Sequence, residues 1–143
     1  MTIRKAEPED KKYILEIINL LNFEISEFIW GDDKFVEKQI KNEEYFLAEI
    51  DGIIAGIISF RQRRDKMYIE TLVVVEKYRS QGIGTQIVEF AKNFTRENKL
   101  KTLRVCSFCE DKAQGFYLKL GFSLLQKLGE YKNYKYHRFE MKL

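Results

Sequence analysis

The middle of the chain contains the run Arg79-Ser80-Gln81-Gly82-Ile83-Gly84-Thr85. It follows Leu72-Val73-Val74-Val75, which is typical of a buried strand, and it opens a helix expected over residues 82–98. The first amides of a helix lack intrahelical partners and lie at the positive end of its dipole. Gly82 and Gly84 let a ligand approach those amides closely, because no Cβ stands in between. The run therefore predicts an anion site that suits phosphate groups.

Three phosphate-binding designs can be compared with this run. The P-loop string G-x-x-x-x-G-K-[ST] does not occur in the sequence. The dinucleotide fingerprint G-x-G-x-x-G fails because Ile87 occupies its third glycine position. The remaining design is the R/Q-x-x-G-x-G turn that holds the pyrophosphate of coenzyme A, and Arg79-x-x-Gly82-x-Gly84 matches it in full. The alternative is a pair of glycines that only shapes a turn.

A second segment strengthens the coenzyme A interpretation. It reads Ala113-Gln114-Gly115-Phe116-Tyr117-Leu118-Lys119-Leu120-Gly121-Phe122, an A-x-x-F-Y-x-K-x-G-F string. Two earlier segments precede it in order, Ile3-Arg4-Lys5-Ala6 with Asp10, and Asp51-Gly52 with Gly56. Together these segments resemble the GNAT superfamily of acyl-CoA-dependent N-acyltransferases, and the resemblance covers the whole chain.

The resemblance implies an α/β (α+β) fold. Its sheet would be mixed and mostly antiparallel, with six to seven strands, splayed between strands four and five and flanked by about four helices. Hydrophobic periodicity predicts strands over 2–5, 45–50, 53–61, 67–75 and 100–106, and two more in the tail 122–143, divided at 129–133. It predicts helices that begin near residue 8 and that span 34–42, 82–98 and 111–120. Asp51-Gly52 predicts a type I′ hairpin turn, whose central residues both need positive φ.

Composition limits the size and class of the protein. The 143 residues suit a single domain, here an acyl-CoA N-acyltransferase domain over 1–143, and 45% apolar residues exclude a disordered chain. Lys and Arg number 25 against 22 Asp and Glu, so the net charge of +3 disfavours a dedicated nucleic-acid binder. No stretch approaches the ~20 apolar residues that span a bilayer, and the N-terminus lacks a signal-peptide core. We expect a soluble, cytoplasmic protein with no membrane partner.

The chain has one C-x-x-C pair, Cys106 and Cys109, and one histidine, His137. A structural zinc site needs four ligands, and a redox motif opens a helix, whereas Leu103-Arg104-Val105-Cys106 reads as the end of a strand. We therefore expect no metal site and two buried or half-buried thiols that behave as small apolar side chains.

The resemblance also implies where acyl-CoA binds. Its pantetheine arm would lie along Leu72, Val73 and Val74, and a backbone N–H near Val74 would meet the oxyanion. The pyrophosphate would be held by Arg79, Ser80, Gln81, Gly82, Ile83, Gly84 and Thr85. A strand of Leu and Val is compatible with this role, because it offers a ligand only its backbone groups.

The reaction implied by the family is direct transfer of an acetyl group from acetyl-CoA to a primary amine in a ternary complex. A lysine-like amine is about one part in a thousand unprotonated at pH 7, so a base is needed. Glu70 is the candidate base, because on a strand it shares a face with Leu72 and Val74; a solvated position paired with a lysine is the alternative. Tyr117 of the F-Y pair is the candidate acid for the thiolate; a ring that only packs is the alternative.

Two departures from the family pattern concern the substrates. Glu110 stands where the family usually has an Asn, which leaves open whether cofactor binding is weakened. The fifth strand lacks the glutamate of enzymes that acetylate ribosomal-protein N-termini. The acidic and aromatic segment 22–33 favours a small cationic, polyamine-like amine. A protein lysine or N-terminal acetyltransferase, a non-catalytic acyl-CoA-binding module and a homodimer stay open.

Overall fold

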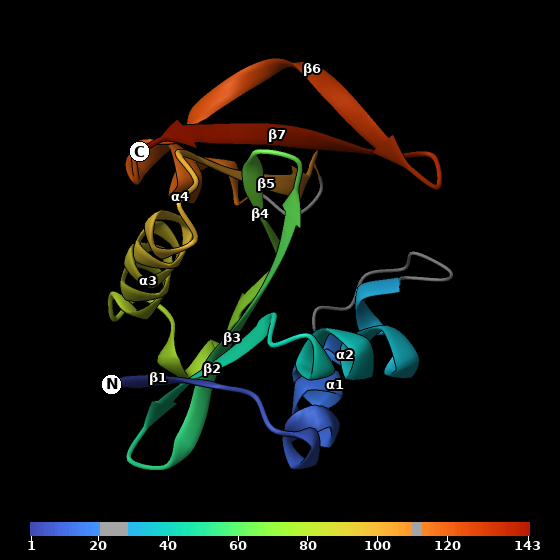
Figure 1. Ribbon diagram of the computed structural model, residues 1–143, viewed down its shortest axis with the longest axis vertical. Coiled ribbons are helices and arrows are strands. Elements are labelled where there is room, and N and C mark those ends of the chain that lie inside the picture. The colour runs from blue at the N-terminus through green and yellow to red at the C-terminus, as the bar shows by residue number, and fades with distance from the viewer. Residues whose placement is uncertain (21–28, 110–112) are drawn as a thin grey trace. The chain divides into compact units, whose positions relative to one another are not determined.

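The computed structural model describes residues 1–20, 29–109 and 113–143. One seven-stranded sheet has the order β1-β2-β3-β4-β5-β7-β6 (Figure 1). The strands are β1 (Thr2–Lys5), β2 (Tyr45–Ile50), β3 (Ile53–Arg63), β4 (Lys66–Val74), β5 (Thr102–Phe108), β6 (Ser123–Tyr131) and β7 (Tyr134–Lys142). The helices are α1 (Lys11–Asn19), α2 (Asp33–Lys41), α3 (Ile83–Glu97) and α4 (Gln114–Lys119).

The pairing of the strands confirms a mixed, mostly antiparallel sheet. The pairs β1–β2, β2–β3, β5–β7 and β6–β7 are antiparallel. The pair β4–β5 is parallel, with Met67 opposite Leu103 and Ile69 opposite Val105. The α/β class expected from the sequence is therefore correct.

The chain divides into two compact units. The first unit comprises Met1–Phe60 and Glu70–Ile87, and the second comprises Arg61–Ile69 and Val88–Leu143. Each is described by itself below.

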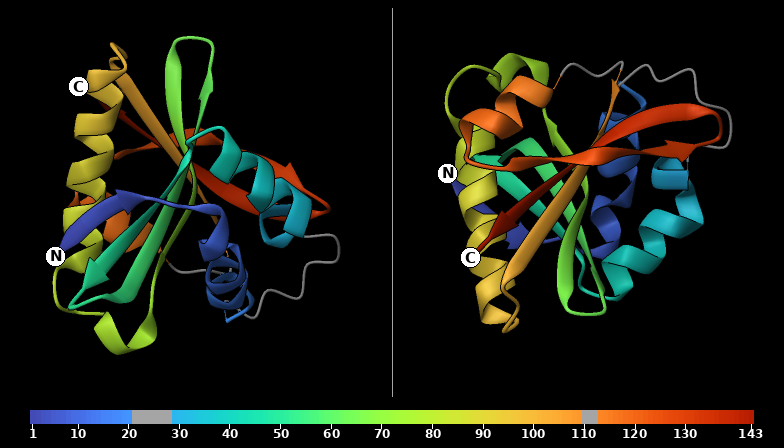
Figure 2. Two further views of the ribbon diagram at one scale, coloured as in Figure 1. Left: turned by 60° about the horizontal axis from the view of Figure 1, so that its bottom comes forward. Right: turned by 90° about the horizontal axis from the view of Figure 1, so that it is seen from above.

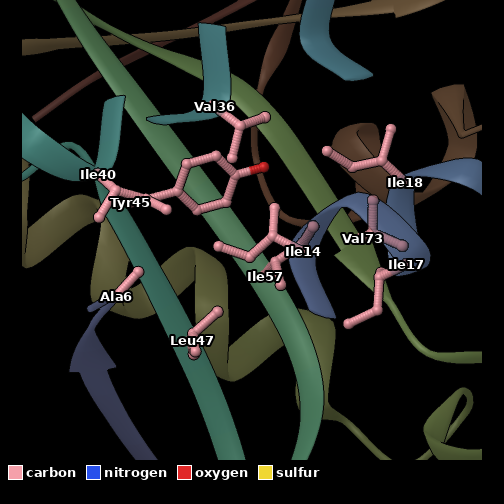
Figure 3. Packing of buried hydrophobic residues seen from close by; sticks show 10 residues of the cluster. All are labelled: Ala6, Ile14, Ile17, Ile18, Val36, Ile40, Tyr45, Leu47, Ile57 and Val73. Atoms are coloured by element: carbon pink, nitrogen blue, oxygen red, sulfur yellow. The ribbon is translucent and has the colours of Figure 1, made fainter. Parts of the chain in front are cut away.

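The core of the first unit lies between its helices α1 and α2 and its strands (Figure 2). The apolar i, i+3, i+4 spacing of α1 puts Ile14, Ile17 and Ile18 on one buried face. Figure 3 shows how these side chains meet residues from the other elements, namely Ala6, Val36, Ile40, Tyr45, Leu47, Ile57 and Val73. Burial raises the pKa of the Tyr45 hydroxyl well above its ordinary value, so it stays neutral. This core fixes β4 beside β3 in the first unit.

The core of the second unit is aromatic. Tyr117 of α4 packs against Phe122 and Phe139, with ring centroids 5.7 and 5.3 Å apart. All three side chains are buried. The F-Y and G-F parts of the second sequence motif therefore meet in one cluster.

The tail forms two strands that divide within the predicted range 129–133, but the turn is narrower than that range. The turn is the two-residue loop Lys132-Asn133, with φ of 50° and 70°, and Gly129 lies inside β6. A register shift precedes Gly129, and the ring of Tyr136 fills the space that a Cβ there would need. Gly129 therefore serves close packing of a ring on the strand and does not start a turn.

The two cysteines also differ from expectation. Cys106 and Cys109 are both exposed and are not joined in a disulfide, so the expected burial is wrong. The strand β5 does not end at Cys106 but runs on to Phe108, which pairs with Tyr136 of β7. Cys106 takes the exposed position between the buried Val105 and Ser107, as the period of two requires.

Within the described residues, no helix combines the length and the apolar character needed to cross a membrane.

Candidate functional site

The strand β4 alternates strictly between two faces. Met67, Ile69, Thr71 and Val73 are buried, whereas the residues between them are half-buried. Those half-buried positions include Glu70, Leu72 and Val74. The expected common face of these three residues is confirmed. It places a carboxylate next to two apolar side chains on one strand.

Glu70 is the fifth of the nine residues of β4, and it is not at a strand end. The indole Nε1–H of Trp30 donates a hydrogen bond of 2.7 Å to its Oε2. Trp30 belongs to the short 3-10 turn Ile29–Gly31, forty residues away in sequence. Glu70 therefore lies in the middle of β4 and not at a solvated strand end.

The glycine turn follows β4 through the 3-10 turn Glu76–Tyr78. Ser80 and Gly82 both have positive φ, 63° and 79°, so the backbone reverses its curvature just before α3. The first helical bond runs from Gln86 N to Gly82 O at 3.1 Å, and the amides of residues 83–85 precede it. A Cβ built on Gly82 meets nothing within 4 Å, so the turn is open. These amides have the arrangement that binds an anion at a helix N-terminus.

Side chains tie this turn to the end of β4. Nε of Arg79 donates to the carbonyl oxygen of Val74 at 3.0 Å, and Nε2 of Gln81 donates to that of Lys77 at 3.3 Å. Ile83 is buried and anchors the start of α3, whereas Thr85 is exposed. The helix begins at Ile83, one residue after the predicted start at Gly82. Ile83 can therefore contribute only its backbone N–H to the predicted pyrophosphate site.

Gly56 of β3 allows α3 to approach the sheet. A Cβ on Gly56 would lie 2.8 Å from Cδ1 of Ile87 and 3.0 Å from the carbonyl oxygen of Val73. The amide of Val75 donates to the carbonyl of Ala55 at 2.8 Å, which continues the pairing of β4 with β3. The close fit at Gly56 fixes both the end of β4 and the position of Ile87 in α3.

Tyr117 belongs to the second unit, whereas Glu70, residues 72–74 and residues 79–85 all belong to the first. Its backbone N–H donates to Ala113 at 3.3 Å, and its carbonyl accepts from Phe122 at 3.1 Å. Its ring is buried among aromatic side chains. The ring of Tyr117 is thus packed, as both the acid and the packing interpretation allow.

The acidic and aromatic segment 22–33 is described only from residue 29 onward. There Asp32 caps α2 by accepting a hydrogen bond of 3.0 Å from the amide of Phe35, and Asp33 pairs with Lys11 at 3.0 Å. These two carboxylates thus have partners inside the protein. Glu24 and Glu27, and likewise Glu110, lie outside the described residues.

The contact between Trp30 and Glu70 was missed by the sequence reasoning. The sequence holds one signal for this contact. Trp30 is the single tryptophan of the chain, and a partly buried indole N–H usually finds a hydrogen-bond acceptor. Which acceptor it finds depends on tertiary structure. Over the described ranges, no group of three or more His, Cys, Asp or Glu side chains is arranged to hold a metal ion.

Solved structures with a similar fold are acetyltransferases and coenzyme A complexes. Ard1 from Thermoplasma volcanium matches with a TM-score of 0.85 and 18% identity, over 99% of this chain and 97% of that one. The PaiA N-acetyltransferase from Thermoplasma acidophilum, in complex with coenzyme A, has a TM-score of 0.80 and 17% identity, over 99% and 98%. Rv2747 from Mycobacterium tuberculosis, also solved in complex with CoA, has a TM-score of 0.82 and 16% identity, over 100% and 99%.

A family model gives the assignment at the level of sequence. The model described as the acetyltransferase (GNAT) family matches residues 13–122, which is well over half of the chain. That range includes Glu70, the glycine turn and Tyr117. The chain belongs to the GNAT acetyltransferase family.

Proposed function

We propose that this protein transfers an acetyl group from acetyl-CoA to the primary amine of a small cationic acceptor. The observation that carries the proposal is the open glycine turn at the start of α3, directly after β4. It combines helix N-terminal amides that precede the first helical hydrogen bond with a glycine whose missing Cβ leaves open space. Such a turn suits the pyrophosphate of coenzyme A.

The residues present fit coenzyme A as a substrate. In the proposal, Ser80 and Gln81 present their exposed backbone with Gly82 to the pyrophosphate, and residues 83–85 add the helix amides. Arg79 supplies the positive charge. Leu72, Val73 and Val74 can offer an amide-bearing arm only backbone hydrogen bonds, because their side chains are apolar.

The chemistry assigned to the side chains is proton transfer. The amine nitrogen attacks the thioester carbonyl carbon, so a C–N bond forms and the C–S bond breaks. Glu70 accepts the proton that the amine must lose, and the hydroxyl of Tyr117 donates a proton to the departing thiolate and regains one from solvent. Counted from the neutral amine, the products are the N-acetyl amine and the free thiol of coenzyme A, because the proton that Glu70 releases balances the one that Tyr117 takes from solvent. An acceptor that arrives as an ammonium releases one further proton to solvent.

Charge supports a cationic acceptor. The first unit, which contains Glu70, has 9 Lys and Arg against 15 Asp and Glu, a formal net charge of −6. A field of this sign raises the local concentration of cations. An ammonium group next to Glu70 and the indole of Trp30 would gain from an ion pair and a cation–π contact.

The experiment is an acceptor panel. The protein is incubated with acetyl-CoA and with polyamines, simple monoamines, lysine peptides or peptides with free N-termini, while thiol release is followed. Each acceptor has its N-acetylated form as a matched control. We expect release with the polyamines and none with the blocked forms.

Two outcomes would overturn the proposal. Release with peptides only would assign a protein lysine or N-terminal acetyltransferase. Binding of coenzyme A by calorimetry without thiol release for any acceptor would assign a non-catalytic module.

A further inference from the structure

We infer that Trp30 is a positioning residue for the carboxylate of Glu70. The inference rests on the proposed function of Glu70 as the base. It concerns a residue of the segment 22–33 whose indole N–H donates to Glu70.

The geometry of the contact suits a charged carboxylate. The distance of 2.7 Å between Nε1 of Trp30 and Oε2 of Glu70 is at the short end of N–H···O bonds. Short bonds of this kind are typical when the acceptor is ionised. Both side chains are partly buried, so the bond is less weakened by water than a surface contact. The indole N–H therefore holds one oxygen of the base in a defined place.

The donor is itself held in place by the elements around it. Two residues after Trp30, Asp32 caps the N-terminus of α2, and Asp33 binds Lys11 of α1. The indole is thus carried by a turn that leads directly into the capped start of α2, and the first residue of α2 is paired with α1. A positioning group needs support of this kind from the elements around it.

The chemistry of the donor also fits. An indole N–H is neutral and donates only, so it orients the carboxylate without cancelling its charge. A Lys or Arg at this place would form an ion pair with Glu70 and would compete with a cationic acceptor. A tryptophan adds no charge of its own beside the base.

A double-mutant cycle on kcat tests the inference, with the best acceptor of the panel. Trp30→Phe keeps an aromatic ring and removes the N–H, and Glu70→Gln removes the base. We expect Glu70→Gln to lower kcat about 10²- to 10⁴-fold. Trp30→Phe should lower kcat about 10-fold in the wild-type background and by less than about 2-fold in the Glu70→Gln background, because the two residues act as one unit.

Tyr13→Phe is the matched control, because it removes one polar hydrogen from an exposed aromatic side chain of α1. It should leave kcat unchanged. A second readout does not depend on activity. The chain has a single tryptophan, so its indole N–H gives one side-chain signal in a ¹⁵N-labelled sample. We expect this signal to move upfield in Glu70→Gln, since a neutral amide oxygen is a weaker acceptor than a carboxylate.

The outcomes separate the inference from the proposed function. If Glu70→Gln keeps the wild-type kcat, the base is wrong and the inference fails with it. If Glu70→Gln is slow but Trp30→Phe loses the same factor in both backgrounds, Trp30 acts independently of Glu70 and the inference alone fails. An indole signal that Glu70→Gln does not move also overturns it.

Discussion

Arg4 of β1 binds two carboxylates of the first unit at once. Its guanidinium donates to both oxygens of Asp10, at 2.8 and 3.0 Å, and its Nε donates to Glu49 at 2.6 Å. Asp10 also accepts from the amide of Glu7 at 2.7 Å. The hydrogen bonds from Arg4 hold the pKa of Asp10 below its ordinary value. The start of α1 is thus tied to the sheet by an ionic network.

The substitution Asp10→Asn is expected to lower the free energy of unfolding at pH 7 by about 1–3 kcal/mol, because Arg4 loses its charged partner. A carboxyl with a lowered folded-state pKa contributes stability above its unfolded pKa, and that contribution is lost as pH falls through the folded value. The gap between wild type and variant should therefore persist from pH 7 to about pH 4 and close below that.

Urea unfolding across this pH range measures the gap. Lys5→Gln is the matched control, since the pair of Lys5 and Glu43 is exposed and should contribute less than about 1 kcal/mol. A gap that does not depend on pH would contradict the role of the Asp10 charge.

The substitution Tyr117→Phe removes the hydroxyl and keeps the ring that packs against Phe122 and Phe139. It therefore separates the effect of the hydroxyl from that of the ring. A phenol of ordinary pKa about 10 protonates a thiolate of about 8.5 uphill by ~2 kcal/mol, so it assists the reaction and is not indispensable. We expect kcat to fall about 10- to 10³-fold with KM unchanged and little change in melting temperature. Tyr131→Phe serves as the control, because Tyr131 of β6 lies beside another aromatic ring of this unit, that of Phe108, with 6.3 Å between the ring centroids. Full activity of Tyr117→Phe would leave that residue a packing role only.

At the scale of elements, the turns between β2 and β3 and between β6 and β7 use the same device. Asp51-Gly52 and Lys132-Asn133 both place two successive residues at positive φ. This matches a type I′ turn, whose twist suits the strands that it joins. Only the first pair has the Asp-Gly sequence that favours such a turn.

Two glycine-to-alanine changes should have opposite effects on stability. Neither Gly52 nor Gly115 has a heavy atom within 4 Å of a built Cβ, so packing does not contribute. Gly52→Ala puts a Cβ at a φ of 77° and should destabilise the protein by about 1 kcal/mol. Gly115→Ala lies in α4 and should stabilise it by about 0.5–1 kcal/mol, because the unfolded chain loses freedom. If Gly52→Ala and Gly115→Ala shift the urea midpoint of unfolding by the same amount, backbone φ does not explain their effects on stability.

Local patterns predicted most of the fold, and tertiary contacts decided the rest. The hairpin at Asp51-Gly52 and the helix after the glycine turn follow from residue type, because φ preference and apolar period are local properties. The turn at Lys132-Asn133 lies inside the predicted range 129–133, but Gly129 looks like a turn residue, and only the ring of Tyr136 explains its place in a strand. For the site, the alternation of side chains along a strand predicted that Glu70 shares a face of β4 with Leu72 and Val74. The partner Trp30, forty residues away, could not be predicted from period or spacing.

At the scale of the whole molecule, the near-neutral total hides two opposite charges. The first unit has a formal charge of −6, whereas the second has 16 Lys and Arg against 7 Asp and Glu, a formal +9. The net +3 of the chain thus describes neither unit. Because Glu70 belongs to the acidic unit, a substrate with more positive charge should be attracted more strongly to its surroundings.

Salt tests this attraction. A linear diamine and the monoamine of equal carbon length carry the same reacting group, but only the diamine has a second charge. Raising NaCl from about 0.05 M to about 0.5 M shortens the Debye length to a few ångströms, which screens charges beyond direct contact. We expect the KM of the diamine to rise about three- to tenfold and that of the monoamine to rise less, with both kcat values nearly constant, because screening weakens encounter and not the chemical step. If salt changes both KM values by the same factor, the acidic unit does not select the second charge, and acceptor preference must come from direct contacts alone.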